Sequence, residues 1–160
     1  MRVGIGYDVH PFAAGRPLVL GGVTVESERG LAGHSDADAL THAVADALLG
    51  AAALGDLGTH FPDTDPAWRG AASLELLACV ASLVAAEGLE LGNLDATVVT
   101  EAPPLARHVP AMRANLARAL GVGVERVSLK ATRHEGLGAL GRGEGLAAIA
   151  VALLVGKESG

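Results

Sequence analysis

The hydrophobic positions at the start of the chain recur at every second residue, which is the period of a β-strand. Residues 1–10 alternate in this way and predict a first strand. Two shorter apolar runs, residues 18–20 and 23–25, flank the pair Gly21-Gly22. A double glycine between two such runs favours a tight hairpin turn, so a small hairpin is predicted here.

The spacing of the apolar residues then changes to that of a helix. Residues 39–48 repeat at intervals of three and four, and Ser35 and Asp36 before them are candidates for the N-cap. Residues 73–87 predict a second helix, which Gly88 would end.

The second half of the chain contains both the helical and the strand spacing of apolar residues. Residues 110–120 predict a third helix, with a proline in its first turn and Gly121 as its stop. Residues 95–101 and 127–132 are β-rich and predict strands. The continuous apolar run 146–155 suits a buried strand or a buried helix by period alone, and its β-branched residues favour the strand.

The order of these elements predicts the fold class. Residues 50–70 and 135–145 hold many turn-forming residues and are predicted to be loops. Strands and helices interleave, so we expect an α+β fold, a mixed α/β sandwich. In it, one sheet of about four to five main strands and a small hairpin pack against three helices. A length of 160 residues without an interdomain linker predicts a single domain over residues 1–160.

The composition and net charge of the chain limit the kinds of molecule that it is expected to bind. Aromatic residues make up only 2% of the chain, so the core must consist of alanine, leucine and valine, and such a chain gains from burying more surface in an oligomer. A net charge of −6 argues against nucleic acid as a partner. The lone Cys79 favours a reducing compartment. With no signal pattern and no apolar stretch of membrane-spanning length, no membrane partner and a cytoplasmic location are expected.

Three residues have the spacing of a metal site. Asp8 and His10 lie two apart on the predicted strand, so their side chains point to the same face. His42 lies in the first predicted helix between Asp38 and Asp46, either of which could orient its second ring nitrogen. Two histidines and one carboxylate leave one tetrahedral position open, as in catalytic zinc sites. The alternative is an aspartate-histidine pair that binds nothing, beside an exposed ladder of helix ion pairs.

Other polar stretches could bind a phosphate, hydroxyl groups or a cation. Residues 34–36 precede a helix, where free N–H groups favour a phosphate, although they could simply cap it. Residues 55–65 hold three carboxylates that could recognise hydroxyls or a metal, or form an ordinary loop. Glu135 could bind a hard cation. Arg142, between two glycines, could meet a phosphate or lie exposed.

Five motifs follow one another along the chain. They are Asp8-Val-His10; residues 33–38, Gly-His-Ser-Asp-Ala-Asp, leading to His42; residues 46–56, Asp-Ala-Leu-Leu-Gly-Ala-Ala-Ala-Leu-Gly-Asp; residues 61–65, Phe-Pro-Asp-Thr-Asp; and residues 141–145, Gly-Arg-Gly-Glu-Gly. In this order they resemble the 2-C-methyl-D-erythritol 2,4-cyclodiphosphate synthase family. The resemblance runs from about residue 2 to residue 154 without an obvious insertion.

The resemblance implies a reaction and an assembly. Enzymes of this family are metal-dependent phosphorus-oxygen lyases of the non-mevalonate route to isoprenoid precursors. The substrate is 4-diphosphocytidyl-2-C-methyl-D-erythritol 2-phosphate, whose 2-phosphate attacks the β-phosphorus and expels CMP. The family is a homotrimer with active sites between subunits, and an isoprenoid diphosphate on the trimer axis is a further candidate partner. On this basis residues 1–160 are expected to form one catalytic domain.

The resemblance also implies the site residues. Zinc would be held by Asp8, His10 and His42, a second ion, Mg²⁺ or Mn²⁺, by Glu135, and His34 is the catalytic candidate. The expected substrate-binding residues are Asp8, Val9, His10, His34, Ser35, Asp56, Leu57, Gly58, Phe61, Pro62, Asp63, Thr64, Asp65, Thr100, Glu101, Ala102, Pro103, Pro104, Leu105, Ala106, Ala131, Thr132, Arg133, His134, Glu135 and Arg142.

Four positions depart from the family pattern. Arg133 stands where the family usually has a threonine with a transition-state role, and His134 where it often has a small polar residue. Pro104 replaces a lysine of some relatives, and Ala139 an aromatic residue near the trimer axis. Relative to some relatives, a positive charge is lost at position 104 and one is gained at position 133. We therefore hypothesise that Arg133 supplies the positive charge that Pro104 does not.

Two other functions remain alternatives at this stage. A zinc hydrolase of another phosphoester would use the open metal position to activate water. A non-catalytic trimer would bind a nucleotide or an isoprenoid, with residues 146–155 lining an apolar channel between subunits.

Overall fold

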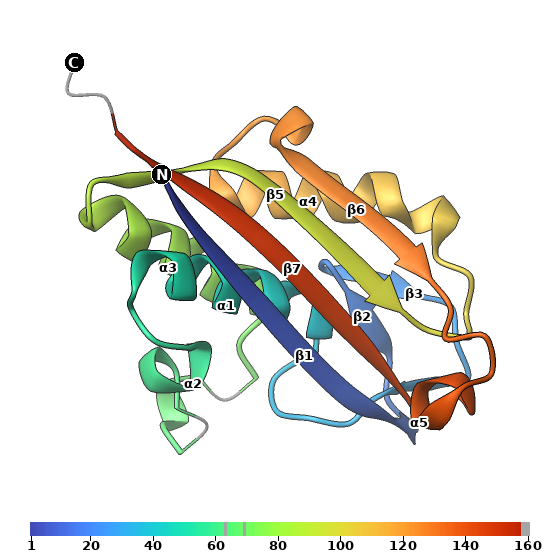
Figure 1. The fold of residues 1–160 in the computed structure, drawn as a ribbon. Helices are drawn as coiled ribbons and strands as arrows, with labels where there is room; N and C mark the ends of the chain where they lie inside the picture. Colours follow the sequence, from blue (N-terminus) through green and yellow to red (C-terminus); the bar gives the residue numbers. More distant parts are fainter. Residues whose placement is uncertain (63, 69, 158–160) are drawn as a thin grey trace.

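The computed structural model describes residues 1–62, 64–68 and 70–157. One five-stranded sheet forms its centre, with the strand order β4-β1-β7-β5-β6. The sheet strands are β1 (Arg2–Ala14), β4 (Arg29–Leu31), β5 (Leu89–Val99), β6 (Val127–Thr132) and β7 (Gly145–Gly156). Neighbouring strands are antiparallel except β5 and β6, which are parallel. The long strands β1 and β7 therefore run side by side along the middle of the sheet (Figure 1).

The three long helices lie against one face of this sheet (Figure 1). They are α1 (Ala39–Ala52), α3 (Ser73–Ala86) and α4 (Val109–Leu120). The strands β2 (Leu18–Leu20) and β3 (Val23–Val25) form a separate hairpin. Two short helices, α2 (Leu57–His60) and α5 (Gly138–Gly141), and 3₁₀ turns at Pro66–Trp68, Ala106–His108 and Val124–Arg126 complete the described chain. The α+β class and the sheet packed against three long helices are confirmed.

Most predicted elements are present, and their boundaries show what the patterns missed. The run 146–155 is a strand, as its β-branched residues predicted. The first strand continues past residue 10 to Ala14, and β5 begins at Leu89, directly after the turn at Gly88, rather than at residue 95. The elements β4, α2 and α5 were not predicted, because three or four residues are too short to show a period.

The N-cap of α1 is Asp38, so the prediction of Ser35 or Asp36 was wrong. The fully buried Asp38 carboxylate accepts hydrogen bonds from the backbone N–H groups of Thr41 (3.0 Å), Gly21 (2.9 Å) and Gly22 (2.8 Å). Both glycines have positive φ, which turns their N–H groups toward the helix end. One carboxylate thus caps α1 and attaches the hairpin to it.

Glycines in β1 let α1 lie directly on the strand. A Cβ on Gly4 would stand 2.1 Å from the Ala47 carbonyl oxygen, and one on Gly6 would stand 1.8 Å from that of Ala43. Apart from Met112, the buried core cluster consists of alanine, leucine and valine, as the composition predicted. Because the helix backbone approaches so closely, the side chain of His42 in α1 reaches Asp8 in the middle of β1.

The opposite face of the central strands is apolar and exposed. Glycines occupy the helix side of β1, and the side chains between them point outward; Ile5, for example, is 69% exposed. We call this surface the open face; its residues are Val3, Ile5, Tyr7, Val9, Ile149 and Val151. Among the described residues, no helix combines the length and apolar character needed to cross a bilayer.

Candidate metal centre

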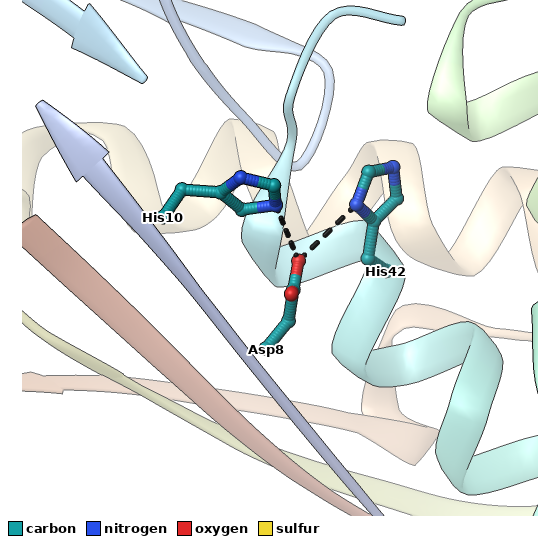
Figure 2. Close-up of side chains that lie close together, drawn as sticks. All are labelled: Asp8, His10 and His42. Atoms are coloured by element: carbon teal, nitrogen blue, oxygen red, sulfur yellow. Dashed lines mark hydrogen bonds and ion pairs between the residues drawn. The ribbon is translucent and has the colours of Figure 1, made fainter. Parts of the chain in front are cut away.

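Strand β1 and helix α1 bring Asp8, His10 and His42 together (Figure 2). The Nε2 atom of His10 lies 2.8 Å from Oδ2 of Asp8, and Nδ1 of His42 lies 3.2 Å from the same oxygen. One ligand atom from each residue falls within 4.8 Å of the other two. The cluster predicted from spacing therefore forms in one chain, half-buried, with both rings turned to one carboxylate oxygen.

The backbone defines which nitrogen of His10 faces the cluster. Its Nδ1 atom lies 2.7 Å from the carbonyl oxygen of Ala32. A carbonyl oxygen only accepts, so Nδ1 carries the hydrogen and the lone pair of a neutral ring is on Nε2, facing Asp8. Gly33 makes room for this ring, because a Cβ there would stand 2.8 Å from its Nδ1 atom.

The second nitrogen of His42 has a partner that the sequence analysis did not name. Nε2 lies 2.9 Å from the hydroxyl oxygen of Ser73, at the start of α3. The predicted partners, Asp38 and Asp46, act elsewhere. Asp38 caps α1, and Asp46 accepts a hydrogen bond of 2.8 Å from the backbone N–H of Leu57. Ser73 lies 31 residues from His42, and no spacing pattern connects two residues so far apart.

The charges of the cluster favour a bound cation. Burial disfavours the charged form of Asp8, but when the facing nitrogens of His10 and His42 carry protons, their hydrogen bonds outweigh it and hold the pKa of that carboxyl well below its usual range. The hydrogen bond to Asp8 raises the pKa of His10. An ionised carboxylate with two inward-facing imidazole nitrogens is a donor set that suits a divalent ion with nitrogen and oxygen ligands and an open position.

A cavity of ≈ 560 Å³ opens beside the three ligands. The predicted residues that line it, besides the ligands, are His34, Ser35, Leu57, Gly58, Phe61 and Pro62. Trp68 also lines it and was not predicted; its ring meets that of Phe61 edge-on with centroids 4.9 Å apart. Part of the wall thus comes from residues 55–65, the stretch predicted either to recognise hydroxyls or a metal or to form an ordinary loop.

Several predicted substrate contacts lie outside this lining. Asp56 caps α2 through the backbone N–H of Thr59 at 2.8 Å. The side chain of Val9 belongs to the open face, although its N–H donates to Asp8 Oδ1 at 3.0 Å. Thr64 and Asp65 are not among the lining residues, and Asp63 lies outside the described residues.

A second cavity of ≈ 570 Å³ lies where the parallel strands β5 and β6 end. Ten of the twelve expected substrate-binding residues in the stretches 100–106 and 131–135 line it, namely Thr100, Glu101, Pro103, Pro104, Leu105, Ala106, Ala131, Thr132, Arg133 and Glu135. The other two expected residues lie beside it. The Ala102 carbonyl accepts from the Thr100 hydroxyl (2.7 Å), and the His134 N–H donates to Glu101 (2.8 Å).

Among the described residues, none lines both cavities within one chain. Glu135 lines the second cavity and is not part of the metal-ligand group found in the described chain. Arg142 lines neither cavity and forms an exposed ion pair with Glu144, with 2.6 Å between Nε and Oε1. Most of the residues predicted for one site therefore fall in two separate places of the chain, and Arg142 lies in neither.

Comparison with known proteins identifies the family. A model described as the YgbB family matches residues 1–155. The chain belongs to the YgbB family. A relative from Pelobacter propionicus, named 2-C-methyl-D-erythritol 2,4-cyclodiphosphate synthase, is 59% identical over 98% of this chain and 99% of its own length. The resemblance read from the five motifs is confirmed.

Solved structures of YgbB-family relatives have the same fold. The bifunctional IspDF of Campylobacter jejuni superposes with a TM-score of 0.92 at 43% identity over 96% of this chain, which spans 42% of that longer protein. A 2C-methyl-D-erythritol-2,4-cyclodiphosphate synthase described as a CDP-bound form superposes with a TM-score of 0.89 at 40% identity. The match covers 96% of this chain and 100% of that one.

Proposed function

We propose that this YgbB-family protein converts 4-diphosphocytidyl-2-C-methyl-D-erythritol 2-phosphate into 2-C-methyl-D-erythritol 2,4-cyclodiphosphate and CMP. An oxygen of the 2-phosphate attacks the β-phosphorus, and the bond from that phosphorus to the oxygen bridging to the α-phosphate breaks. CMP leaves with the bridging oxygen. The observation that carries the proposal is a metal-ligand triad opening onto a cavity, in a chain 59% identical over nearly its full length to a synthase of this name.

Asp8, His10 and His42 would hold zinc, because two imidazole nitrogens and a carboxylate form the donor set of an open zinc site. When bound, the ion supplies positive charge to a substrate phosphate oxygen. His34 and Ser35 line the same cavity and would contact that phosphate. The attacking phosphate is already ionised, so the residues need to position it and balance its charge rather than deprotonate it. This suits a cluster without a strong general base.

The second cavity would take the cytidine diphosphate part of the substrate. Its ≈ 570 Å³ lies within the usual range for small-molecule sites, about 300–1,000 Å³. Glu135 in its wall offers a carboxylate for a second ion, Mg²⁺ or Mn²⁺. Arg133 in the same wall brings a guanidinium that can bind phosphate. The CDP-bound form of a relative with a TM-score of 0.89 supports a cytidine nucleotide as ligand.

A homotrimer would join the two cavities into intersubunit active sites. One chain holds them apart, so a neighbouring copy is needed to bring Glu135 of one subunit near the metal ligands of another. The open face supports such an assembly, because contiguous exposed apolar surface marks interaction sites. An isoprenoid diphosphate is a candidate for the apolar surface around the trimer axis. The exposed free Cys79 supports a reducing, cytoplasmic location.

The test is to incubate the purified protein with the cytidylyl substrate and to follow the products by phosphorus NMR and by CMP release. The proposal expects one cyclic diphosphate and one CMP per substrate. A linear phosphate product would favour the zinc phosphoester hydrolase instead. Nucleotide binding without turnover would favour the non-catalytic trimer.

A further inference from the structure

The ring nitrogen of His42 that points away from Asp8 contacts a hydrogen-bonded pair, the buried Ser73 and the half-buried Asp36. The hydroxyl of Ser73 lies 2.9 Å from His42 Nε2, and Ser73 is only 1% exposed. The same hydroxyl donates a short hydrogen bond to the carboxylate of Asp36. A second contact joins the pair, because the backbone N–H of Ser73 donates to Asp36 Oδ2 at 3.0 Å. The start of α3 thus meets the distant segment that precedes and begins α1 behind one metal ligand.

The hydrogens available in these contacts determine the tautomer of the His42 ring. A hydroxyl has one hydrogen, and a carboxylate is an acceptor, so the hydrogen of Ser73 points to Asp36. The oxygen of Ser73 must then accept from His42, which places the ring hydrogen on Nε2. In a neutral imidazole the lone pair is then on Nδ1, the atom 3.2 Å from Asp8.

We infer that Ser73 and Asp36 are positioning residues, which hold His42 so that Nδ1 is its metal-ligating atom. They do for His42 what the Ala32 carbonyl does for His10. Neither touches the reacting atoms; they act through the ligand, as partners of metal-bound histidines commonly do. The inference deepens the proposed function and rests on its metal centre.

Ser73 also begins α3, so a purely structural role must be separable from this one. Ser73→Ala removes the hydroxyl but leaves the backbone N–H that bonds Asp36. The attachment of α3 to the Asp36 segment is therefore kept, while the contact with His42 is lost. Ser82→Ala is the matched control, because it removes an exposed hydroxyl of the same helix, which bonds only the Ala78 carbonyl at 3.1 Å in the described contacts.

The experiment titrates the metal-free proteins with Zn²⁺ against a competing chelator of known affinity. Ser73→Ala is expected to bind Zn²⁺ about 10- to 100-fold more weakly than the unmodified protein, and Ser82→Ala equally well. Ser73→Thr, which keeps a hydroxyl, should restore much of the affinity. The visible spectrum with Co²⁺ in place of Zn²⁺ should change for Ser73→Ala, and melting in the presence of chelator should change little.

The outcomes separate this inference from the proposed function. If the unmodified protein binds no Zn²⁺, or if His42→Ala leaves its affinity unchanged, the proposed metal centre fails. If the unmodified protein binds Zn²⁺ and Ser73→Ala matches it in affinity and Co²⁺ spectrum, the positioning role is overturned while the proposed function stands. An affinity loss in Ser73→Ala accompanied by unfolding of the metal-free protein would assign Ser73 a structural role and also overturn it.

Discussion

Gly6 of β1 and Ala43 of α1 lie so close that a Cβ on the glycine would stand 1.8 Å from the alanine carbonyl oxygen. The helix backbone therefore rests on the strand backbone with no side chain between them. His42 is the neighbour of Ala43 and reaches Asp8 from there (Figure 2). The geometry of the metal centre thus depends on Gly6, because the absence of a side chain there lets α1 approach β1.

Gly6→Ala should push α1 away from β1. We expect a loss of about 1–3 kcal/mol in the free energy of unfolding, typical of overpacking, and weaker metal binding, because His42 moves with the helix. Urea unfolding and Zn²⁺ titration measure the two effects. Gly50→Ala is the control, because a Cβ there meets only the Ile5 carbonyl oxygen at 3.9 Å and should stabilise the helix by about 0.5–1 kcal/mol. Equal behaviour of the two variants would contradict the argument.

Removing the metal should stop the reaction. Treatment with a chelator is expected to reduce CMP release to background, and added Zn²⁺ should restore it, because the ion held by the triad would supply the positive charge for the phosphate in that cavity. His42→Ala should lose activity that Zn²⁺ does not restore. Metal analysis beside a CMP assay tests both. Full activity in a protein shown to be free of metal would contradict the proposed role of the triad.

Arg133→Ala tests whether this arginine contributes positive charge at the second cavity. Loss of a charge-assisted contact to phosphate should lower kcat/KM by about 10- to 100-fold, and Arg133→Lys should keep part of it. Steady-state kinetics with the cytidylyl substrate give the answer. Arg118→Ala, at the end of α4, is the control for loss of a surface charge. Unchanged turnover and substrate affinity in Arg133→Ala would remove the hypothesis.

A charge on the open face should prevent assembly. Ile5→Glu places a carboxylate among apolar side chains that a trimer would bury, so we expect the mass in solution to fall from three chains to one chain of 16.0 kDa. Activity should fall with it if the active sites lie between subunits. Light scattering after gel filtration measures the mass. Val124→Glu alters an exposed apolar residue away from this face and should leave the mass unchanged.

Asp38→Asn should destabilise the fold without touching the metal ligands. Both carboxylate oxygens of Asp38 accept two hydrogen bonds each, from donors in the hairpin turn and in α1. An amide NH₂ group would face donors at one of these positions, at a cost of about 1–3 kcal/mol. Chemical unfolding checks this. Asp56→Asn, at the exposed cap of the short helix α2, should cost far less.

The periods of the sequence predicted the long elements well. The three long helices, the hairpin and the strand nature of residues 146–155 follow from local spacing and from turn residues such as Gly88 and Gly121. The ligands Asp8, His10 and His42 could also be predicted, because the period of a strand places two of them on one face. The N-cap of α1 could not. Several residues before the helix have suitable side chains, and the one used was decided by the distant N–H groups of Gly21 and Gly22.

The sequence by itself therefore determined the elements, the ligand types and, through the order of its motifs, the family. Only the tertiary structure decided that Ser73 rather than Asp38 or Asp46 holds the second nitrogen of His42, and that the two predicted halves of the site lie apart in one chain. The physical reason is the separation along the sequence over which each kind of signal acts. Periodicity and capping act over a few residues, whereas the partner of a buried ring nitrogen depends on which backbone packs against it.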